Sequence, residues 1–574
     1  MNFDFTEDRN RYLDCILNAN AKKKLIIAGP GTGKTYTFKK ILEKTFESEK
    51  KKGLVITFIK NLVKDLKKEL SNYADVRTFH SFCRSEILRI NKHKFEYYPN
   101  LLRIIESDLR ILKPSIQLKN NIEHLFYVLN ETEIKKILGI ADYYNAAGHT
   151  DSVYRVYKHY QQHEDDIPCY PIVLVDEYQD FNLLETKLVE MLAQKSPILI
   201  IGDDDQALYT FKKSSPKFIR DLAKDSYYKR YELPYCSRCT KVIVDAINEI
   251  ITISKRNNRL VDRIDKEFKY YPPEKEKDSK ENPYIMDVKC SVERKNCPYA
   301  AKYIFNEIIR MPDEYKKEAL NKNEPTALII GPKQFLRSIK SYMKEMNSEL
   351  LYNGMTYIEE KEEMNKPNII DGYKLLLNKP DSNLGWRIIL EEKKDTVTVN
   401  MIKQAIKENK SITSLINRNI YNEQKKIIEI LNKLIKQRPT KEEIKLIEER
   451  IKMPIDEIRK SFSDERDYEE REAEENGKSR ILCTSFEGSK GLAAQYVFIV
   501  GFNKDYFPRK TPPEDIDICR LIVALTRARK RVYLISYKID LSGKSLKDSI
   551  FKSYLNIYLS EPIMVDKDYI KRLS

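Results

Sequence analysis

The stretch that decides the fold is AGPGTGKT, from Ala28 to Thr35. It follows a short apolar run and precedes a segment with apolar positions at helical spacing, so we expect a strand, a glycine-rich loop and a helix. Such a loop wraps backbone N–H groups around a phosphate, while Lys34 neutralises the β- and γ-phosphate oxygens and the Thr35 hydroxyl ligates Mg²⁺. The predicted nucleotide-binding residues of the loop are Ala28, Gly29, Pro30, Gly31, Thr32, Gly33, Lys34 and Thr35.

A second strand-like run ends in two adjacent carboxylates, Asp176 and Glu177. Downstream of a phosphate loop, Asp176 can hold Mg²⁺ through water, and Glu177 can orient and deprotonate the attacking water. A carboxylate pair alone usually marks a solvated strand end, and the apolar strand before this pair is what makes it informative. Phosphoryl transfer also needs positive charge at the γ-phosphate, so we expect Arg238 and Arg527 to reach it from a second domain.

Strand-sized apolar runs alternate with helical segments in both halves of the chain, which predicts α/β domains with parallel sheets. Two mainly helical stretches, near residues 85–164 and 378–476, interrupt this alternation. A third stretch, 255–282, is charged and contains Pro272-Pro273, so we expect an exposed connection there. The predicted architecture is two α/β domains with mainly helical insertions.

Length and composition set broad limits on function. The chain has 574 residues and a net charge of +16, from 103 Lys and Arg against 87 Asp and Glu. That length exceeds what one hydrophobic core usually supports. The charge suits a polyanionic partner such as nucleic acid, but the same composition would follow from AT-rich coding. The apolar runs are strand-sized and shorter than the ~20 residues of a membrane span, so no membrane partner is expected.

The nine cysteines, in a chain whose N-terminus is polar and acidic, are expected to be reduced thiols in the cytoplasm. Cys236 and Cys239 form a CxxC pair, and Cys290 and Cys297 could complete four zinc ligands. The wide spacing of the second pair, and the separate role expected for Arg238, count against a zinc site.

Eight motifs occur in one order between Leu25 and Arg531. They are AGPGTGKT, ITFIKN, RTFHSF, VDEYQDFN, IGDDDQALYTFK, LPYCSRCT, SKGLAAQYVFIVG and IVALTRARKR. The series resembles the motif set of UvrD/Rep-type superfamily 1A DNA helicases, and VDEYQD, GDDDQALY and VALTRA are specific to that group. The resemblance implies two RecA-like P-loop motor domains with helical insertions. Their expected ranges are 1–84 plus 165–230 for domain 1A, 85–164 for 1B, 231–377 plus 477–574 for 2A, and 378–476 for 2B.

The resemblance also implies roles for individual residues. Gln206 would sense the γ-phosphate, and Arg238 and Arg527 would be arginine fingers that close the cleft between the motors. Gly491 would lie at the nucleotide. Aromatic residues on the strand path can stack on bases without reading sequence, although ordinary core packing is the alternative for Tyr209 and Phe211. The expected DNA contacts are Thr57, Phe58, Lys60, Thr78, His80, Tyr209, Phe211 and Lys212.

The chain departs from the family pattern where the nucleotide base would be held. TEDRN stands in place of the segment with the adenine-reading glutamine, and Asn10 is a candidate substitute. Ser237 replaces the tyrosine of the family's NYRS, so Tyr36 is the candidate to stack on adenine, with Tyr235 as the alternative.

Three further departures fall near the ribose and the DNA strand. Ala493 replaces the glutamate of KGLE, and Phe486 stands at a histidine position in a motif that is one residue longer than usual. Phe211 and Lys212 replace a tryptophan and an arginine. The phosphate chemistry is untouched, so we expect ATP hydrolysis more firmly than processive unwinding.

Two functional hypotheses follow. The first is an ATP- and Mg²⁺-dependent DNA helicase or translocase, moving 3′→5′ on single strands or tailed duplexes in repair, recombination or phage defence. The second is an ATP-switched DNA sensor that hydrolyses slowly and recruits a protein partner such as a nuclease. The altered base-contact motifs motivate the second. The motif set argues against a third reading, a motor directed to RNA.

Overall fold

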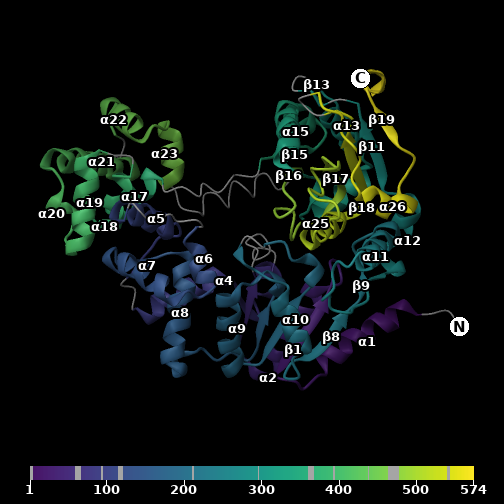
Figure 1. The fold of residues 1–574 in the computed structure, drawn as a ribbon, viewed down its shortest axis with the longest axis horizontal. Coiled ribbons are helices and arrows are strands. Elements are labelled where there is room, and N and C mark those ends of the chain that lie inside the picture. Colours follow the sequence, from purple (N-terminus) through teal and green to yellow (C-terminus); the bar gives the residue numbers. More distant parts are fainter. Residues whose placement is uncertain are drawn as a thin grey trace.

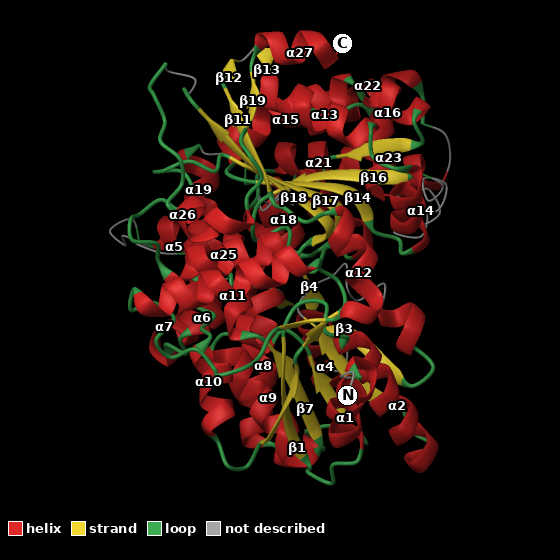
Figure 2. Cartoon of the chain, turned by 90° about the vertical axis from the view of Figure 1, so that its right-hand side faces the viewer, coloured by secondary structure: helices red, strands yellow, loops and turns green. Residues whose placement is uncertain are grey.

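The chain folds into two large parallel sheets and one body of helices, shown in Figure 1. The fold is known from a computed structural model, which describes residues 4–57, 66–91, 95–113, 121–209, 212–291, 293–294, 297–359, 368–391, 395–436, 439–462, 478–539 and 543–573. The predicted α/β class with parallel sheets is confirmed. Figure 2 shows the strands of one sheet above those of the other.

The first sheet has six strands in the order β3-β2-β6-β7-β1-β8, and all its pairs are parallel. Alternate residues of its central strands enter two different cores, because successive side chains point to opposite faces. The helices α1 (Phe5–Leu17) and α2 (Lys34–Glu49) cover one face, and α9 (Leu183–Lys195) with α10 (Lys217–Lys224) covers the other. The strands are β1 Lys23–Ala28, β2 Gly53–Thr57, β3 Ala74–Thr78, β6 Val173–Val175, β7 Ile198–Gly202 and β8 Lys229–Leu233.

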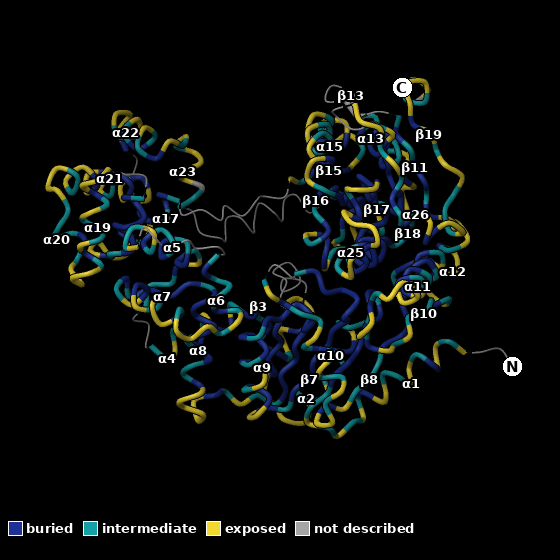
Figure 3. Tube along the Cα trace, viewed as in Figure 1, coloured by how far each residue is buried: buried dark blue, intermediate teal, exposed yellow. Residues whose placement is uncertain are grey.

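The second sheet has seven parallel strands in the order β15-β16-β14-β17-β18-β11-β19. Helices α11 (Lys241–Arg256), α25 (Asp515–Leu525) and α26 (Phe551–Leu555) pack on one face, and α13 (Tyr299–Ile309) with α15 (Lys333–Glu345) packs on the other. Its strands are β11 Met286–Cys290, β14 Pro325–Ile330, β15 Met355–Ile358, β16 Ser479–Thr484, β17 Ala494–Val500, β18 Ala528–Tyr537 and β19 Ile563–Val565. Figure 3 shows the central strands of both sheets as buried.

Twelve further helices of the described residues form what we call the helical body, which shares one continuous core with a face of the first sheet. It joins two stretches far apart in sequence (Figure 1). The first contributes α4 Phe79–Ile90, α5 Leu101–Leu112, α6 Glu123–Tyr127, α7 Glu131–Tyr143 and α8 His149–Gln162. The second contributes α17 Ile369–Asn378, α18 Asn383–Ile389, α19 Thr396–Glu408, α20 Ile412–Leu415, α21 Arg418–Lys436, α22 Lys441–Ile451 and α23 Ile455–Phe462. Helix α17, which precedes the expected boundary at residue 378, packs against α18, α21 and α23.

A buried ion pair ties the two stretches of the helical body together. Arg387 Nε of α18 donates to Asp108 Oδ1 of α5 over 2.7 Å, and both side chains are almost fully buried. The hydroxyl of Tyr144 donates to the other oxygen of Asp108, also over 2.7 Å. Arg387 also pairs with Glu391, whose side chain is 34% exposed. Losing the Arg387 charge would leave Asp108 buried without an ionic partner, and losing Asp108 would leave Arg387 with Glu391 alone.

The expectation that residues 255–282 form an exposed connection is wrong for part of the stretch. Two of its lysines are drawn inward by opposite charges: Lys266 pairs with three aspartates after β7, and the buried Lys275 pairs with Asp278. Lys277 and Lys280 of the same stretch are exposed. The strand β10 (Lys269–Tyr270) pairs with β9 (Tyr235–Cys236), and α12 (Pro272–Glu281) follows. A charged composition therefore did not mean that the whole segment is solvated.

No helix within the described residues combines the length and the apolar character that crossing a membrane requires.

Candidate active site

The glycine-rich loop 28–35, which we call the phosphate loop, lies between β1 and α2, as predicted. Its glycines are required both by the backbone conformation and by the lack of room for a side chain. Gly31 and Gly33 have φ of 71° and 91°, in the left-handed region that favours glycine. A Cβ on Gly31 would lie 2.4 Å from the Cβ of Arg238, and one on Gly29 would lie 2.9 Å from the Phe268 ring. The loop is therefore packed closely against residues that follow β8, the last strand of the first sheet.

Hydrogen bonds fix the loop on both sides. The Thr32 hydroxyl donates to the Gly29 carbonyl over 2.9 Å inside the loop. From the far side, the Ser237 backbone N–H donates to the Gly31 carbonyl over 2.9 Å. Ala28 ends β1 and is buried, and Lys34 and Thr35 open α2. The loop residues thus have the strand–loop–helix placement that a phosphate cradle needs.

The side chain of Lys34 points to the carboxylate pair at the end of β6. Lys34 Nζ lies 3.2 Å from Glu177 Oε1, and Gln179 Nε2 donates to Glu177 Oε2 over 2.6 Å. Glu177 has φ of 52°, a left-handed conformation that is uncommon for a residue with a side chain. Strands β1 and β6 end on the same edge of a parallel sheet, so the loop and the carboxylates meet there.

A lysine from the part of the chain that forms the second sheet completes this cluster. Lys490, between β16 and β17, is buried and lies 3.3 Å from Glu177 Oε2; it also pairs with Asp180 and donates to the Gln206 carbonyl over 2.7 Å. The sequence reading gave Lys490 no role. The signal available was its place in SKGLAAQ, one of the eight ordered motifs.

The two adjacent carboxylates have opposite pKa shifts. Burial, together with the neighbouring Glu177 charge, raises the pKa of Asp176 to about 7. Burial also acts against the Glu177 charge, but Lys34 and Lys490 overcome it and hold the pKa of Glu177 below its ordinary value. Glu177 is therefore the carboxylate that stays ionised. The donors assigned to the metal, the Thr35 hydroxyl and the Asp176 carboxylate, offer the hard oxygens that Mg²⁺ prefers.

Gln206 and the two expected arginine fingers lie where the part of the chain that carries the first sheet meets the part that carries the second. Gln206 Nε2 donates to Asp203 Oδ2 over 2.7 Å, and its Oε1 accepts from Arg527 Nη2 at 3.4 Å. Arg238 Nη1 donates to the Thr526 carbonyl at 3.4 Å, next to Arg527 in the chain. The structure thus brings Gln206, Arg238 and Arg527 together beside the phosphate loop.

Arg527 is a buried cation with neutral partners. Its exposed fraction is 3%, and its nitrogens donate to the carbonyls of Val523 and Leu492 and to the oxygens of Gln206 and Thr526. In the described ranges no carboxylate lies within ion-pair distance of it. Burial and the nearby Arg238 charge lower the pKa of Arg527. An uncompensated buried cation of this kind is electrostatically suited to an anion.

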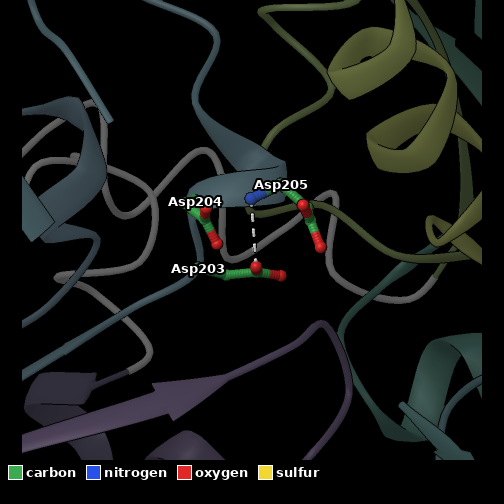
Figure 4. Close-up of side chains that lie close together, drawn as sticks. All are labelled: Asp203, Asp204 and Asp205. Atoms are coloured by element: carbon green, nitrogen blue, oxygen red, sulfur yellow. Dashed lines mark hydrogen bonds between the residues drawn. The ribbon is translucent and has the colours of Figure 1, made fainter. Parts of the chain in front are cut away.

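Three consecutive aspartates follow β7 and lie close together, as Figure 4 shows. Asp203, Asp204 and Asp205 are buried, and each pairs with Lys266. Arg263 adds a bond of 2.9 Å to Asp205. Their charges raise the pKa of Lys266 against the opposing effect of burial. The aspartates are therefore already neutralised by cations, and serve to attach residues 263–266 to the first sheet.

The three residues considered for holding the nucleotide base, Tyr36, Tyr235 and Asn10, differ in their exposure and contacts. Tyr36 is 53% exposed at the start of α2, with Lys40 Nζ 5.8 Å from its ring centre. Tyr235 is buried, and its hydroxyl donates to Asp8 over 2.5 Å. Asn10 is exposed, and its neighbour Arg9 is the α1 residue that reaches the loop at Gly33. Gly491, with φ of 82°, directly follows Lys490.

The residues expected to contact DNA lie on the same sheet edge where they are described. Thr57 and Thr78 end the paired strands β2 and β3, and the Thr78 hydroxyl accepts from the Ser81 N–H at 3.0 Å. The ring of His80 lies 5.1 Å from that of His149. Phe58, Lys60 and Phe211 lie outside the described residues.

Tyr209 bridges the two halves. Its hydroxyl donates to the Glu487 carbonyl at 3.3 Å, and Lys212 and Lys490 each lie 5.7 Å from its ring centre. Burial raises the pKa of Tyr209 to about 12. In this state its ring is largely packed, which is closer to the core-packing alternative than to an open stacking platform.

The four cysteines considered for zinc are not brought together where they can be followed. Cys239 N–H donates to Cys236 Sγ at 3.5 Å, and both side chains are buried in the core on one face of the second sheet. Cys290 lies in the core on the other face, and the side chain of Cys297 is outside the described residues.

Comparison with known proteins agrees with the motif pattern. A family described as "AAA domain" matches residues 15–212. A probable DNA helicase II homolog from Mycoplasma capricolum is 25% identical over 93% of this chain and 84% of its own length. The putative ATP-dependent DNA helicase YjcD from Bacillus subtilis is 24% identical over 48% of this chain and 43% of its own. The ATP-dependent DNA helicase Rep from Buchnera aphidicola is 27% identical over 40% of this chain and 42% of its own.

Proposed function

We propose, from the premise that this chain is a UvrD/Rep-like helicase, that it hydrolyses ATP with Mg²⁺ and uses the energy to move on DNA and separate its strands. In this proposal the first sheet belongs to motor domain 1A and the second to 2A, both RecA-like. The helical body combines 1B and 2B. The direction is 3′→5′ on single-stranded or tailed DNA, within the cytoplasm, in repair, recombination or phage defence.

The observation that carries the proposal is Arg527. It is a buried arginine with only neutral partners, it bonds Gln206, and it comes from the second half of the chain toward the phosphate loop of the first. A γ-phosphate between the halves would supply the missing negative charge and draw them together. Hydrolysis would remove that charge and release the contact, which is how nucleotide state becomes motion.

The chemistry assigns one role to each side chain. Lys34 neutralises the phosphate oxygens, while Glu177, held ionised, takes the proton of the attacking water. Arg238 and Arg527 stabilise the charge that develops on the transferred phosphoryl group. Thr35 and Asp176 would hold Mg²⁺, which when bound would supply further charge neutralisation at the phosphates.

The test is hydrolysis and unwinding by the full chain. ATPase rate should rise when single-stranded DNA is added, and tailed duplexes should be opened when the tail has the polarity for 3′→5′ movement. Arg527→Ala and Lys34→Ala should each abolish hydrolysis, and Glu177→Gln should retain ATP binding without turnover. Persistent turnover in Glu177→Gln would reject its role as the base.

The alternative, an ATP-switched DNA sensor with a partner such as a nuclease, is favoured by one observation. Lys34 and Lys490 both contact Glu177, so protein cations neutralise the proposed base, which fits slow hydrolysis. If the chain binds DNA with ATP but does not open duplexes of either polarity, the sensor proposal replaces the helicase proposal.

A further inference from the structure

The phosphate loop is bordered by a different side chain at each of its three glycines. Gly29 faces Phe268, Gly31 faces Arg238, and Gly33 faces Arg9. The first two contacts come from residues that follow β8, the last strand of the first sheet. The third comes from α1, and a Cβ built on Gly33 would lie 3.5 Å from Arg9 Nη2. Arg9 is therefore the cation at the far end of the loop.

The two ends of a bound triphosphate can be assigned from the residues around it. The γ-phosphate end lies with Lys34, Glu177 and Arg527, where hydrolysis is proposed. The phosphates run along the loop, so the nucleoside leaves at the other end, past Gly33 and beside the exposed Tyr36. Arg9 borders that end. This step rests on the proposed function, because it takes the loop to hold a nucleoside triphosphate.

Neighbouring residues orient the Arg9 guanidinium without taking up all of its hydrogen-bond donors. Its guanidinium carbon lies 4.5 Å from the ring centre of the buried Tyr271, which restrains its plane. Nη1 lies 2.8 Å from Glu274 Oε1, in a pair whose side chains are 26% and 52% exposed. Such partly exposed pairs are weak and exchange readily. Among the residues that the structure describes, no acceptor is bonded to Nη2, the nitrogen nearest the loop.

An arginine can only donate hydrogen bonds, and this decides which base edge it fits. Guanine and hypoxanthine present two acceptors, O6 and N7, on one edge. Adenine presents the acceptor N7 beside an amino donor, which an N–H of Arg9 would oppose. A glutamine at this place would match adenine, because its amide both donates and accepts.

We propose that Arg9 reads the base of the bound nucleotide, and that it makes 6-oxopurine triphosphates substrates at least as good as ATP. The ligand class is a purine nucleoside triphosphate with acceptors at both N7 and position 6. ATP remains a substrate, because its phosphates meet the same catalytic groups.

The experiment compares kcat/KM for ATP, GTP and ITP in the full chain with saturating single-stranded DNA. We expect GTP to equal or exceed ATP, and ITP to follow GTP, because inosine shares O6 and N7 but lacks the 2-amino group. Arg9→Gln should shift the ratio of GTP to ATP toward ATP by about tenfold. The matched control is Arg11→Gln, two residues along α1 and 74% exposed, which should leave the ratio unchanged.

A binding measurement separates this inference from the proposed function. ADP, GDP and IDP compete against a fluorescent ADP analogue, which reports base preference without turnover. If no triphosphate is hydrolysed but GDP and IDP bind as tightly as ADP, the proposed function fails and the role of Arg9 stands. A wild-type preference for ATP and ADP above tenfold would overturn the inference, as would an unchanged ratio in Arg9→Gln.

Discussion

Lys490 Nζ lies 3.3 Å from Glu177 Oε2, so a lysine preceding a strand of the second sheet touches the carboxylate that we assign as the catalytic base. The same lysine pairs with Asp180, and both side chains are buried. Burial raises the pKa of Asp180 to about 6 even with Lys490 beside it. Any separation of the two sheets must therefore break a buried charge cluster at the proposed catalytic base.

Replacing Lys490 tests whether this cluster couples DNA to hydrolysis. In Lys490→Met, Glu177 keeps Lys34 but loses its contact with the second half, so we expect the stimulation of ATPase by single-stranded DNA to fall about tenfold or more. The measurement is the ratio of rates with and without DNA. Lys510→Met, a lysine with 70% exposure, is the control. Equal stimulation in Lys490→Met and wild type would show that the pair is only structural.

Tyr36 is an exposed aromatic side chain at the end of the loop where we propose that the nucleotide base binds. Base–aromatic stacking contributes about 1–3 kcal/mol, so Tyr36→Ala should raise the ATP KM about fivefold or more, with a smaller effect on kcat. Steady-state kinetics with DNA present measure this split. Tyr227→Ala, at a residue that is 81% exposed, should change neither constant. An unchanged KM in Tyr36→Ala would mean that another residue holds the base.

The Asp108–Arg387 pair should be a large contributor to the integrity of the helical body. Asp108→Ala leaves the buried Arg387 guanidinium with Glu391, whose side chain is 34% exposed, as its remaining carboxylate partner. Leaving a buried charge with no partner costs about 3–5 kcal/mol, and Glu391 makes this an upper bound here. We expect a clearly lower unfolding temperature for the full chain, and a partial recovery in the double variant Asp108→Leu with Arg387→Met. If Asp108→Ala unfolds at the same temperature as wild type, the two stretches of the helical body are held together without this pair.

The parts of this structure that could be predicted from the sequence are those with a local sequence pattern. The strand ahead of AGPGTGKT and the strand ahead of Asp176 are apolar runs, and parallel pairing places their ends on one edge. Contacts between distant charges have no such signature. Lys266 was read as part of a solvated connection, although Asp203–Asp205 neutralise it from some sixty residues away. For the same reason, neither Arg387 against Asp108 nor Arg9 against Gly33 could be anticipated.

Glu185 gives the chain a pH-dependent stability that can be checked apart from catalysis. Its carboxylate caps α9 by accepting from the Asn182 N–H at 2.9 Å, and burial raises its pKa from 4.5 to about 7. Between these two values the folded state binds more protons at this site than the unfolded state. Stability therefore falls as the pH rises through that window, by at most about 3 kcal/mol above pH ~8.

Glu185→Gln removes the titration while keeping an oxygen for the Asn182 N–H. We expect this variant to unfold at a higher temperature than wild type at pH 8, and the difference to shrink toward pH 5, where Glu185 is protonated in the folded protein. Glu190→Gln, at a glutamate on the same helix that is 48% exposed, should follow wild type at both pH values. A difference in unfolding temperature between Glu185→Gln and wild type that is the same at pH 5 and pH 8 would show that Glu185 does not titrate in this window. The hydrogen bond from the Asn182 N–H would then by itself compensate for the burial of the Glu185 carboxylate.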